Sequence, residues 1–451
     1  MTSKKMKKIA ILHHGCAKNL VDTELMAGAL QKKGYMVTLD TDDREAEIVV
    51  VNTCSFIYDA EKESVSSIFE MIGAKKKVII AGCLPQKHGE ELQALIPEAV
   101  GFVGTSDIEK IVDIIENLET DKKAVKSPVE STKKNFSVSK NPVCKYPENL
   151  ERVQITVGSS SYIKIAEGCD YACGYCVIPK LRGPYVSRPM EAIVNEAKIL
   201  ANKGVSEVIL IAQDTSSYGI DLYKKPVLAK LLEELNKIEN LSWIRVLYTY
   251  PTNFNDELIN AIAKLDKVVK YVDIPLQHSH PTVLKAMRRP VIDVLAFIKK
   301  LRQKIKGVCI RTTLITGYPI ETEEHFNHLY EFVKAAKFDR LGVFEFSKEK
   351  GTYAYGLKPQ IPARVKKARK NKVLKLQKEI SNKINENLVG QRISCIVEQV
   401  MDDGNAILRS YKDAPDVDGL VYVKTTEILV PGDIWDVKVT GFSDYDLFGE
   451  I

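Results

Sequence analysis

The feature that most constrains the fold of this 451-residue chain is a repeated alternation of short apolar runs with segments of helical spacing. In the first part of the chain the apolar runs are "KKIAILHHGC", "EAEIVVVNTC" and "KKVIIAGC", and a helical segment follows each one. Parallel strands need long crossover connections, so this alternation predicts a parallel sheet covered by helices. We therefore expect an N-terminal α/β domain over residues 1–120.

The middle of the chain repeats the alternation six times. The candidate strands are "YIKIAEG", "EVILIAQD", "WIRVLYTYP", "YVDIPLQH", "CIRTTLITGYP" and "RLGVFEFS". Six strand–helix units in this length predict a (β/α)6 barrel or partial barrel over residues 159–385. The preceding stretch, residues 121–158, is rich in Lys, Ser, Pro and Asn with little periodicity, which is typical of a linker.

The last part of the chain, residues 386–451, changes period. Short runs such as "QRISCIVEQV", "NAILRSYK" and "DIWDVKVTGF" are separated by Gly, Asp and Pro, which predicts a small antiparallel β-barrel of the oligomer-binding type. The fold class is therefore multidomain α/β. No apolar run reaches the roughly 18 residues that a membrane span needs, and the basic start lacks a cleavage site. We expect a cytoplasmic monomer with no membrane segment.

Nine cysteines form an odd number in a large chain, which favours metal binding or redox chemistry over a secreted disulfide framework. Cys16, Cys54 and Cys83 each follow an apolar strand of the first domain. All strands of a parallel sheet end on the same side, so these thiols are expected to converge at one sheet edge. The alternative is three small buried side chains. Three histidines near the same edge are candidate ligands or packing residues: His13, His14 and His88.

A second group of thiols, Cys169, Cys173 and Cys176, has C-x3-C-x2-C spacing just after the first barrel strand, where barrel active sites gather. A structural zinc site is the competing interpretation, but it normally has four protein ligands, and the next hundred residues contain no Cys or His. Three thiolates on a four-iron cluster leave one iron open. The spacing therefore indicates a [4Fe-4S] cluster with a vacancy for a substrate or cofactor.

These motifs resemble a known family. The stretch "GCDYACGYCVIPKLRG" is similar to the signature of radical S-adenosylmethionine (SAM) enzymes. Together with the three N-terminal cysteines and a TRAM-type last domain, the chain resembles the radical SAM methylthiotransferases over nearly its whole length. Within that family "GCAKNLVDTE", "AQDTSSYG" and "DIPLQHSHPTVLKAMRRP" resemble the ribosomal protein aspartate methylthiotransferases. The tRNA-modifying relatives usually have a GCQMN-like stretch where this chain has "GCAKN".

The resemblance implies two [4Fe-4S] clusters, with SAM as both methyl donor and radical source. Cys169, Cys173 and Cys176 would hold the radical-generating cluster, and the N-terminal trio would hold an auxiliary cluster that carries sulfur. No catalytic residue is implied beyond these ligands, since the cofactors supply the difficult chemistry. The residues expected to contact SAM are Tyr175, Gln213, Asp214, Gln277 and Arg311.

Other basic residues and cysteines have less defined roles. Arg182 and Arg188 either meet an anion or belong to a solvated basic loop. The remaining cysteines have no neighbouring partner in the sequence and are interpreted as structural: Cys144, Cys309 and Cys395.

Charge is unevenly distributed around a net of +6. Residues 362–385 contain nine Lys or Arg and one acid, whereas residues 386–451 contain thirteen acids and five bases, a net of −8. An acidic last domain suits a basic partner such as a small-subunit ribosomal protein or the ribosome, unless the acids only keep the barrel soluble. The basic segment suits ribosomal RNA, an acidic electron donor such as flavodoxin or ferredoxin, or solvent.

Two other functions remain open on the sequence alone. One is a tRNA methylthiotransferase that acts on an adenosine. The other is a non-catalytic metal-binding scaffold that binds a partner through its last domain.

Overall fold

The computed structural model describes residues 7–120, 135–147, 151–155, 158–402 and 404–451. They divide into two units. The first comprises residues 1–156, 166–171 and 176–186, and the second comprises residues 157–165, 172–175 and 187–451. Across the described residues, no helix combines the length and the apolar character that crossing a bilayer requires.

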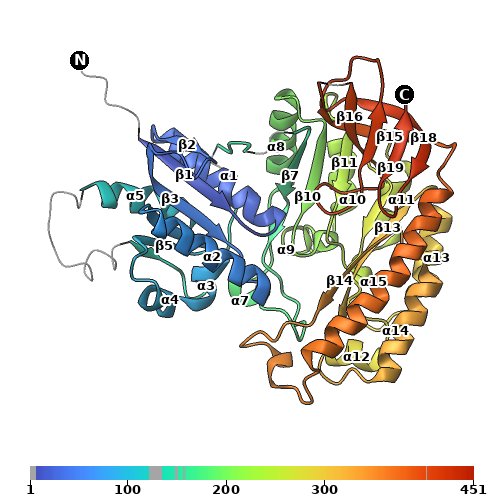
Figure 1. Ribbon diagram of the computed structural model, residues 1–451, viewed down its shortest axis with the longest axis horizontal. Coiled ribbons are helices and arrows are strands. Elements are labelled where there is room, and N and C mark those ends of the chain that lie inside the picture. The colour runs from blue at the N-terminus through green and yellow to red at the C-terminus, as the bar shows by residue number, and fades with distance from the viewer. Residues whose placement is uncertain (1–6, 121–134, 148–150, 156–157, 403) are drawn as a thin grey trace. The chain divides into compact units, whose positions relative to one another are not determined.

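The first unit is built on a six-stranded sheet of order β2-β1-β3-β4-β5-β6, in which every neighbouring pair is parallel (Figure 1). The strands are β1 (Lys8–His13), β2 (Met36–Thr38), β3 (Ala46–Thr53), β4 (Lys77–Gly82), β5 (Gly101–Val103) and β6 (Phe136–Ser137). The predicted parallel α/β domain is thus confirmed. Strands such as β3 and β4 are almost wholly buried, as expected for a parallel sheet with helices on both faces.

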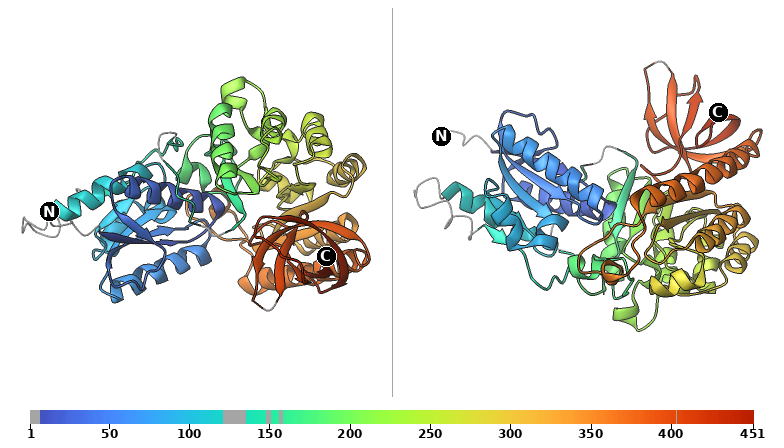
Figure 2. Two further views of the ribbon diagram at one scale, coloured as in Figure 1. Left: turned by 90° about the horizontal axis from the view of Figure 1, so that it is seen from above. Right: turned by 60° about the horizontal axis from the view of Figure 1, so that its bottom comes forward.

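Helices α1 and α5 pack on each other, and α2 packs on β3 and β4 (Figure 2). The helices of this unit are α1 (Ala17–Lys32), α2 (Tyr58–Gly73), α3 (Cys83–His88), α4 (Glu90–Leu95), η1 (Ile108–Lys110), α5 (Ile111–Thr120) and α7 (Ile178–Arg182). The sheet core includes Val49, Val51, Ile80 and Phe102. This core fixes the strand ends that carry the first cysteine group.

The linker predicted over residues 121–158 falls partly outside the described residues, at 121–134, 148–150 and 156–157. Its described parts pack on the first unit. β6 extends the sheet beside β5, and the Arg152 side chain donates a hydrogen bond of 2.5 Å to Glu24. Low periodicity was a poor guide here because a two-residue edge strand leaves no alternation to detect.

The second unit begins with six parallel strands in chain order. They are β7 (Ser160–Lys164), β10 (Glu207–Ile211), β11 (Trp243–Val246), β12 (Tyr271–Asp273), β13 (Cys309–Thr316) and β14 (Arg340–Glu345). They form two three-stranded sheets, β7-β10-β11 and β12-β13-β14, and a parallel bridge between Ile244 and Val268 lies between them. This arrangement confirms the predicted partial barrel.

Helices surround these strands, and a short two-stranded sheet, β8 (Ala166–Glu167) with β9 (Val186–Ser187), lies between β7 and α8 in sequence. The helices are α8 (Met190–Asn202), η3 (Thr215–Ser217), α9 (Ile220–Tyr223), α10 (Leu228–Asn236), η4 (Pro251–Asn253), α11 (Asp256–Lys264), α12 (Pro281–Ala286), α13 (Val294–Lys304), α14 (Glu323–Ala336) and η5 (Tyr353–Gly356). The long helix α15 (Ala363–Glu386) then leads into the last domain (Figure 2).

The last domain is a closed barrel of order β15-β16-β17-β19-β18. Its strands are β15 (Arg392–Val400), β16 (Asn405–Ser410), β17 (Val421–Lys424), β18 (Ile434–Phe442) and β19 (Leu447–Glu450). The small barrel is confirmed, but it is not wholly antiparallel: β17 and β19 pair in parallel, which allows five strands to close. Its core includes Leu408, Val421 and Val437.

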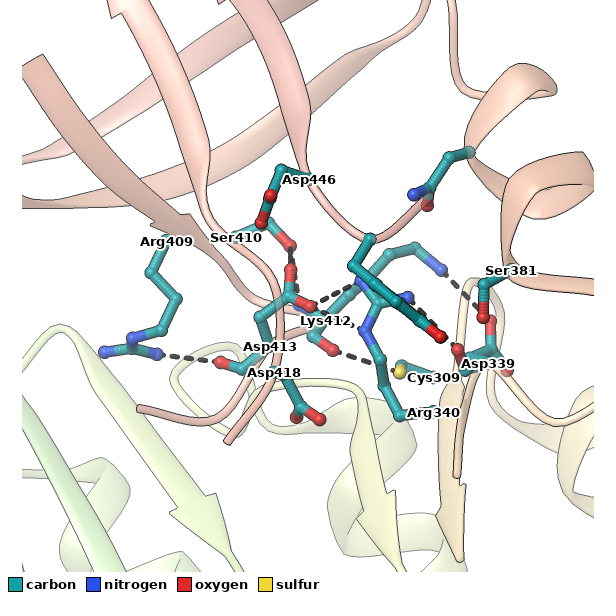
Figure 3. A network of polar contacts seen from close by, with 12 residues as sticks. Cys309, Asp339, Arg340, Ser381, Arg409, Ser410, Lys412, Asp413, Asp418 and Asp446 are labelled. Carbon is teal, nitrogen blue, oxygen red and sulfur yellow. Dashed lines mark hydrogen bonds and ion pairs between the residues drawn. The ribbon is translucent and has the colours of Figure 1, made fainter. Parts of the chain in front are cut away.

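The last two residues of β16 and the turn after it, which we call together the loop 409–418, contact the amino-terminal ends of the central strands (Figure 3). Arg409 forms ion pairs with Glu207, the first residue of β10, and donates to the Ser160 hydroxyl at the start of β7 (2.9 Å). Glu207 also accepts from Arg245 Nε of β11 at 2.7 Å. The side chains of Glu207, Arg245 and Arg409 are at most 1% exposed.

The same loop reaches the other three strands. The Tyr271 hydroxyl, at the start of β12, donates to Asp418 at 2.6 Å. The Cys309 thiol, at the start of β13, donates to the Lys412 carbonyl at 3.1 Å. Arg340 Nε, at the start of β14, donates to Asp413 Oδ1 at 2.7 Å. Each of the six strands of the partial barrel therefore has a polar side chain near its start that bonds this loop or a residue ion-paired with it.

Candidate iron–sulfur sites

The carboxyl-terminal edge of the first sheet holds Cys16, Cys54 and Cys83. Cys54 directly follows β3 and Cys83 directly follows β4, and Thr53 lies opposite Gly82 in the β3–β4 register, so the two thiols are neighbours. Cys16 follows β1, which pairs with β3 on its other side. Cys54 and Cys83 are buried, whereas Cys16 is exposed and occupies the N-cap position of α1 without a side-chain capping hydrogen bond. A helix amino terminus favours a negatively charged group at that position.

Two of these cysteines follow glycines that the geometry requires. Gly15 has φ +97°, and a Cβ there would lie 2.7 Å from Cys54 Cβ. Gly82 has φ +91°, and a Cβ there would lie 2.3 Å from Asn52 Oδ1. Residues with a side chain rarely adopt such φ values, and here the space is also filled. The backbone is thus drawn tightly around the three thiols.

Asn19 joins the loops that carry the thiols. Its Nδ2 donates to the carbonyls of His14 (3.2 Å) and Thr53 (2.9 Å), which lie at the ends of β1 and β3. Its Oδ1 accepts from Arg182 Nη2 at 2.6 Å and from the Cys83 thiol at 3.8 Å. One amide therefore links two strand ends, a cysteine and a buried cation.

Arg182 is that cation, and it is 1% exposed. Its Nη1 donates to both oxygens of Glu167 (2.9 and 3.1 Å), and its Nη2 donates to Asp22 (3.0 Å). Arg188 is also buried: it donates to Glu196 at 2.6 Å and to the Lys164 carbonyl at 2.8 Å. The solvated basic loop considered for both arginines is therefore wrong.

Burial raises the pKa of both buried thiols of this group. Burial, together with the neighbouring Cys83 and Cys16, raises the pKa of Cys54 to about 12. Burial also raises the pKa of Cys83. Metal ligation needs the thiolate, so binding here would release protons.

The donor set fits an iron–sulfur cluster, since cysteine thiolates are its usual ligands. In the described part of the chain, no three Cys, His, Asp or Glu side chains are close enough to hold a single metal ion. A four-iron cluster separates its ligands more widely than one ion does, so this finding does not conflict with a cluster. Two of the three nearby histidines have other contacts: His14 hydrogen-bonds Ser67 and His88 hydrogen-bonds Glu61, each at 2.9 Å. His13 Nδ1 is buried and has no hydrogen-bond partner among the described residues.

The second cysteine group lies in the loop between β8 and α7, and all three thiols are partly exposed. The Cys169 amide donates to the Gly183 carbonyl at 3.0 Å, and the Ile178 amide donates to Cys176 Sγ at 3.4 Å. These contacts fix the two flanks of the motif.

The centre of this loop contacts another arginine, Arg289, which is partly buried. Arg289 lies near Cys173, donates to the Pro275 carbonyl at 2.6 Å and stacks over the Tyr250 ring at 4.1 Å. The Gly174 amide donates to the Met287 carbonyl at 2.8 Å. The end of α12 thus supports the cysteine loop.

The residues expected to contact SAM lie at two different ends of the barrel. Tyr175 packs on the apolar group of Val283, Met287 and Tyr318. Gln213 follows the end of β10. Gln277 lies beyond β12, with φ +70°, and pairs with Leu314 near the end of β13.

The other two expected contacts have structural partners. Asp214 accepts from the Ser216 amide (2.9 Å) and the Ser217 hydroxyl (2.5 Å), and so caps η3. Arg311 is the third residue of β13, near its amino-terminal end, and its Nη1 donates to Asp273 at 3.1 Å. Its Nε lies 3.5 Å from Asp418 of the C-terminal barrel. Arg311 is therefore away from the strand ends that carry Gln213 and Gln277.

The sequence patterns do not single out Asn19, Asp22 or Arg289. The signal was present, because "GCAKNLVDTE" contains the first two and "MRRP" contains the third. Their partners are distant in sequence, so the motif alone did not reveal what they bond.

Comparisons with known proteins agree with this architecture. Residues 8–104 match the model of Uncharacterized protein family UPF0004, residues 163–333 match the Radical SAM superfamily, and residues 389–451 match the TRAM domain. "Ribosomal protein uS12 methylthiotransferase RimO" of Microcystis aeruginosa is 45% identical over 98% of both chains. The protein of the same name from Caldanaerobacter subterraneus subsp. tengcongensis is 45% identical over 99% of this chain and 100% of its own.

The chain belongs to the RimO family. Membership makes it a radical SAM methylthiotransferase, an enzyme class that uses SAM and a [4Fe-4S] cluster. Among solved structures, the radical SAM methyltransferase TsrM from Kitasatospora setae is similar, with a TM-score of 0.52 and 15% identity. The match covers 86% of this chain and 79% of TsrM, and at this identity it shows a shared fold alone.

Proposed function

We propose that this enzyme inserts a methylthio group at the β-carbon of an aspartate in ribosomal protein uS12. The relatives that match the whole chain carry that substrate in their names. The observation that carries the two-cluster mechanism is the tight edge of the first sheet, where Gly15 and Gly82 bring Cys16, Cys54 and Cys83 together.

Each cysteine group is assigned one [4Fe-4S] cluster. Cys169, Cys173 and Cys176 hold the cluster that generates the radical from SAM, and Cys16, Cys54 and Cys83 hold the auxiliary cluster. When bound, SAM would supply the methyl group and the radical that removes hydrogen from an unactivated carbon, and the auxiliary cluster would supply the sulfur. The protein positions them and keeps water away.

The chain's own residues prepare both sites. Asn19 and Arg182 fix the loops around the auxiliary site, because each bonds more than one element there. Arg289 and the Gly174–Met287 backbone hydrogen bond support the loop around Cys173. We assign SAM contacts to Tyr175, Gln213 and Gln277, which lie at or beyond carboxyl-terminal strand ends.

Asp214 supports that region through its turn. Arg311 was expected to pair with the SAM carboxylate, but its ion pairs with Asp273 and Asp418 favour a structural role at the opposite end of the barrel.

The substrate is a basic protein, and the C-terminal barrel has a net charge of −8 over residues 386–451. Opposite charges on the barrel and on the substrate accelerate their encounter and favour binding of the substrate to the barrel. We further assign the enzyme to the cytoplasm, as a monomer reduced by a flavodoxin or ferredoxin, in keeping with a ribosomal substrate and a low-potential cluster.

The test separates radical formation from sulfur insertion. The chain is reconstituted anaerobically with iron and sulfide and given SAM, a reductant and uS12. The triple variant Cys16→Ala, Cys54→Ala, Cys83→Ala is expected to form 5′-deoxyadenosine but no methylthio-aspartate, whereas Cys169→Ala is expected to lose both. Cys144→Ala, outside both groups, is the control and retains both.

The products are measured by mass spectrometry of uS12 peptides and of tRNA nucleosides. Methylthio groups that appear on adenosine and not on uS12 would reassign the substrate. Sulfur insertion by the triple variant would remove the auxiliary site from the mechanism.

A further inference from the structure

Helix α15 is a rigid rod with one anchored face. Arg369 Nη1 donates to Glu321 at 2.7 Å, Gln377 donates to the Phe338 carbonyl at 2.8 Å, and Asn385 donates to the Ser443 carbonyl at 3.3 Å. These residues are buried and lie along most of its length. Its 24 residues make a rod of about 36 Å. Its outer face is therefore held in one orientation.

Four exposed cations lie along the helix, spread over the width of its exposed face. Arg364, Lys367, Lys375 and Lys383 are all exposed, and they extend over about 29 Å of helix axis. We call these four residues the basic stripe. The ion pairs of the helix use other residues, such as Arg369 with Glu321 and Lys378 with Asp444 at 2.8 Å.

The composition of this face distinguishes between two kinds of anionic partner. Protein–protein interfaces have an apolar, often aromatic, centre. Among the described residues, none of the large exposed hydrophobic side chains lies on α15. Phosphate contacts need only spaced cations, and a row of Lys and Arg along a helix is the usual footprint of a nucleic-acid backbone. An acidic electron donor would lack an apolar anchor here.

We propose that the basic stripe docks on the phosphate backbone of ribosomal RNA, so that the enzyme acts on uS12 within the RNA-bearing small subunit. The identity of the protein substrate rests on the proposed function. The adjoining barrel adds a complementary observation, because it follows α15 directly and has a net charge of −8. A basic helix surface beside an acidic domain suits a surface made of both RNA and basic protein.

The test uses the full-length, reconstituted enzyme. The stripe variant carries Arg364→Gln, Lys367→Gln, Lys375→Gln and Lys383→Gln. The control variant removes the same charge from exposed lysines on other parts of the same domain: Lys230→Gln, Lys299→Gln, Lys304→Gln and Lys306→Gln. All eight side chains are exposed, so thermal unfolding of both variants is expected to match the parent.

Binding to purified small ribosomal subunits is measured at several salt concentrations. In the stripe variant the slope of log Kd against log salt concentration is expected to decrease by about 3–4. Its Kd at physiological salt is expected to rise at least about tenfold. The control is expected to stay within about twofold. Methylthiolation of free uS12 is expected to be equal in all three proteins, while that of assembled subunits falls only in the stripe variant.

Equal subunit binding by the stripe and control variants overturns the proposal. It is also overturned if the stripe variant binds subunits normally but is reduced slowly by flavodoxin and normally by dithionite, since the partner is then an acidic protein. Failure of the parent to modify uS12 in either form would refute the proposed function. The salt-dependent binding of the parent is measured without turnover and tests the stripe separately.

Discussion

Replacing Glu207 with glutamine is expected to destabilise the second unit strongly, although Glu207 is not part of either candidate iron–sulfur site. Its carboxylate is fully buried between the guanidinium groups of Arg245 and Arg409, and it also accepts from the Ser160 hydroxyl at 2.8 Å. A glutamine has one oxygen for two cations, and its NH2 group would face a donor. The variant therefore leaves a buried positive charge without its partner.

The size of the effect follows from the electrostatics of the carboxylate. Despite burial, which opposes ionisation, Arg245 and Arg409 lower the pKa of Glu207 from 4.5 to about 2. That difference corresponds to about 3 kcal/mol of stabilisation of the ionised form. Removing one partner of a buried ion pair typically costs about 3–5 kcal/mol, which agrees with the value from the pKa of Glu207.

The assay is urea unfolding of the metal-free chain followed by tryptophan fluorescence. The chain has two tryptophans, Trp243 in β11 and Trp435 in β18, one in each barrel. Glu207→Gln is expected to lower the free energy of unfolding by about 3 kcal/mol. Glu398→Gln is the control, because Glu398 also pairs with Arg409 but is 24% exposed, and its loss should cost less than about 1 kcal/mol. Equal effects of the two variants would refute the reasoning.

Three further predictions concern the pH dependence of the Glu207 contribution and two residues of the first unit. The contribution of Glu207 is present above about pH 4.5 and is lost as pH falls towards 2, so acid titration of unfolding should be flatter in this window for Glu207→Gln. Arg182→Met should destabilise the first unit by about 3–5 kcal/mol, seen as faster amide exchange in β3 and β4, since Glu167 and Asp22 lose their cation; unchanged exchange would count against it. Gly82→Ala should halve the iron bound after reconstitution, whereas Gly34→Ala, also at positive φ but with open space, should keep it; equal iron contents would contradict this account.

The arrangement of strands was readable from the sequence because periodicity is a local property. The runs that end at Cys54 and Cys83 are continuous and apolar, as buried parallel strands are, and this placed both residues at strand ends. Long-range pairing is not local. Arg182 bonds Asp22 across 160 positions and Arg409 bonds Glu207 across 202, and no periodic pattern records such partners.

The position of Arg311 shows a related limit. Alternation locates a strand but not which end of it a residue occupies when the strand is long. β13 runs over eight residues, Cys309–Thr316, so Arg311 lies near its beginning and meets the loop of the C-terminal barrel instead of the strand ends that carry Gln213 and Gln277.

The loop 409–418 has a consequence for engineering. Because it supplies counter-charges to the first residues of the central strands, the C-terminal barrel is not an exchangeable accessory. A chimera that takes this barrel from a tRNA-modifying relative would leave Glu207 and Arg340 without ion-pair partners, unless the new barrel supplied the same charges. Retargeting such enzymes therefore requires a graft that includes both the loop 409–418 and the charged residues at the start of the central strands.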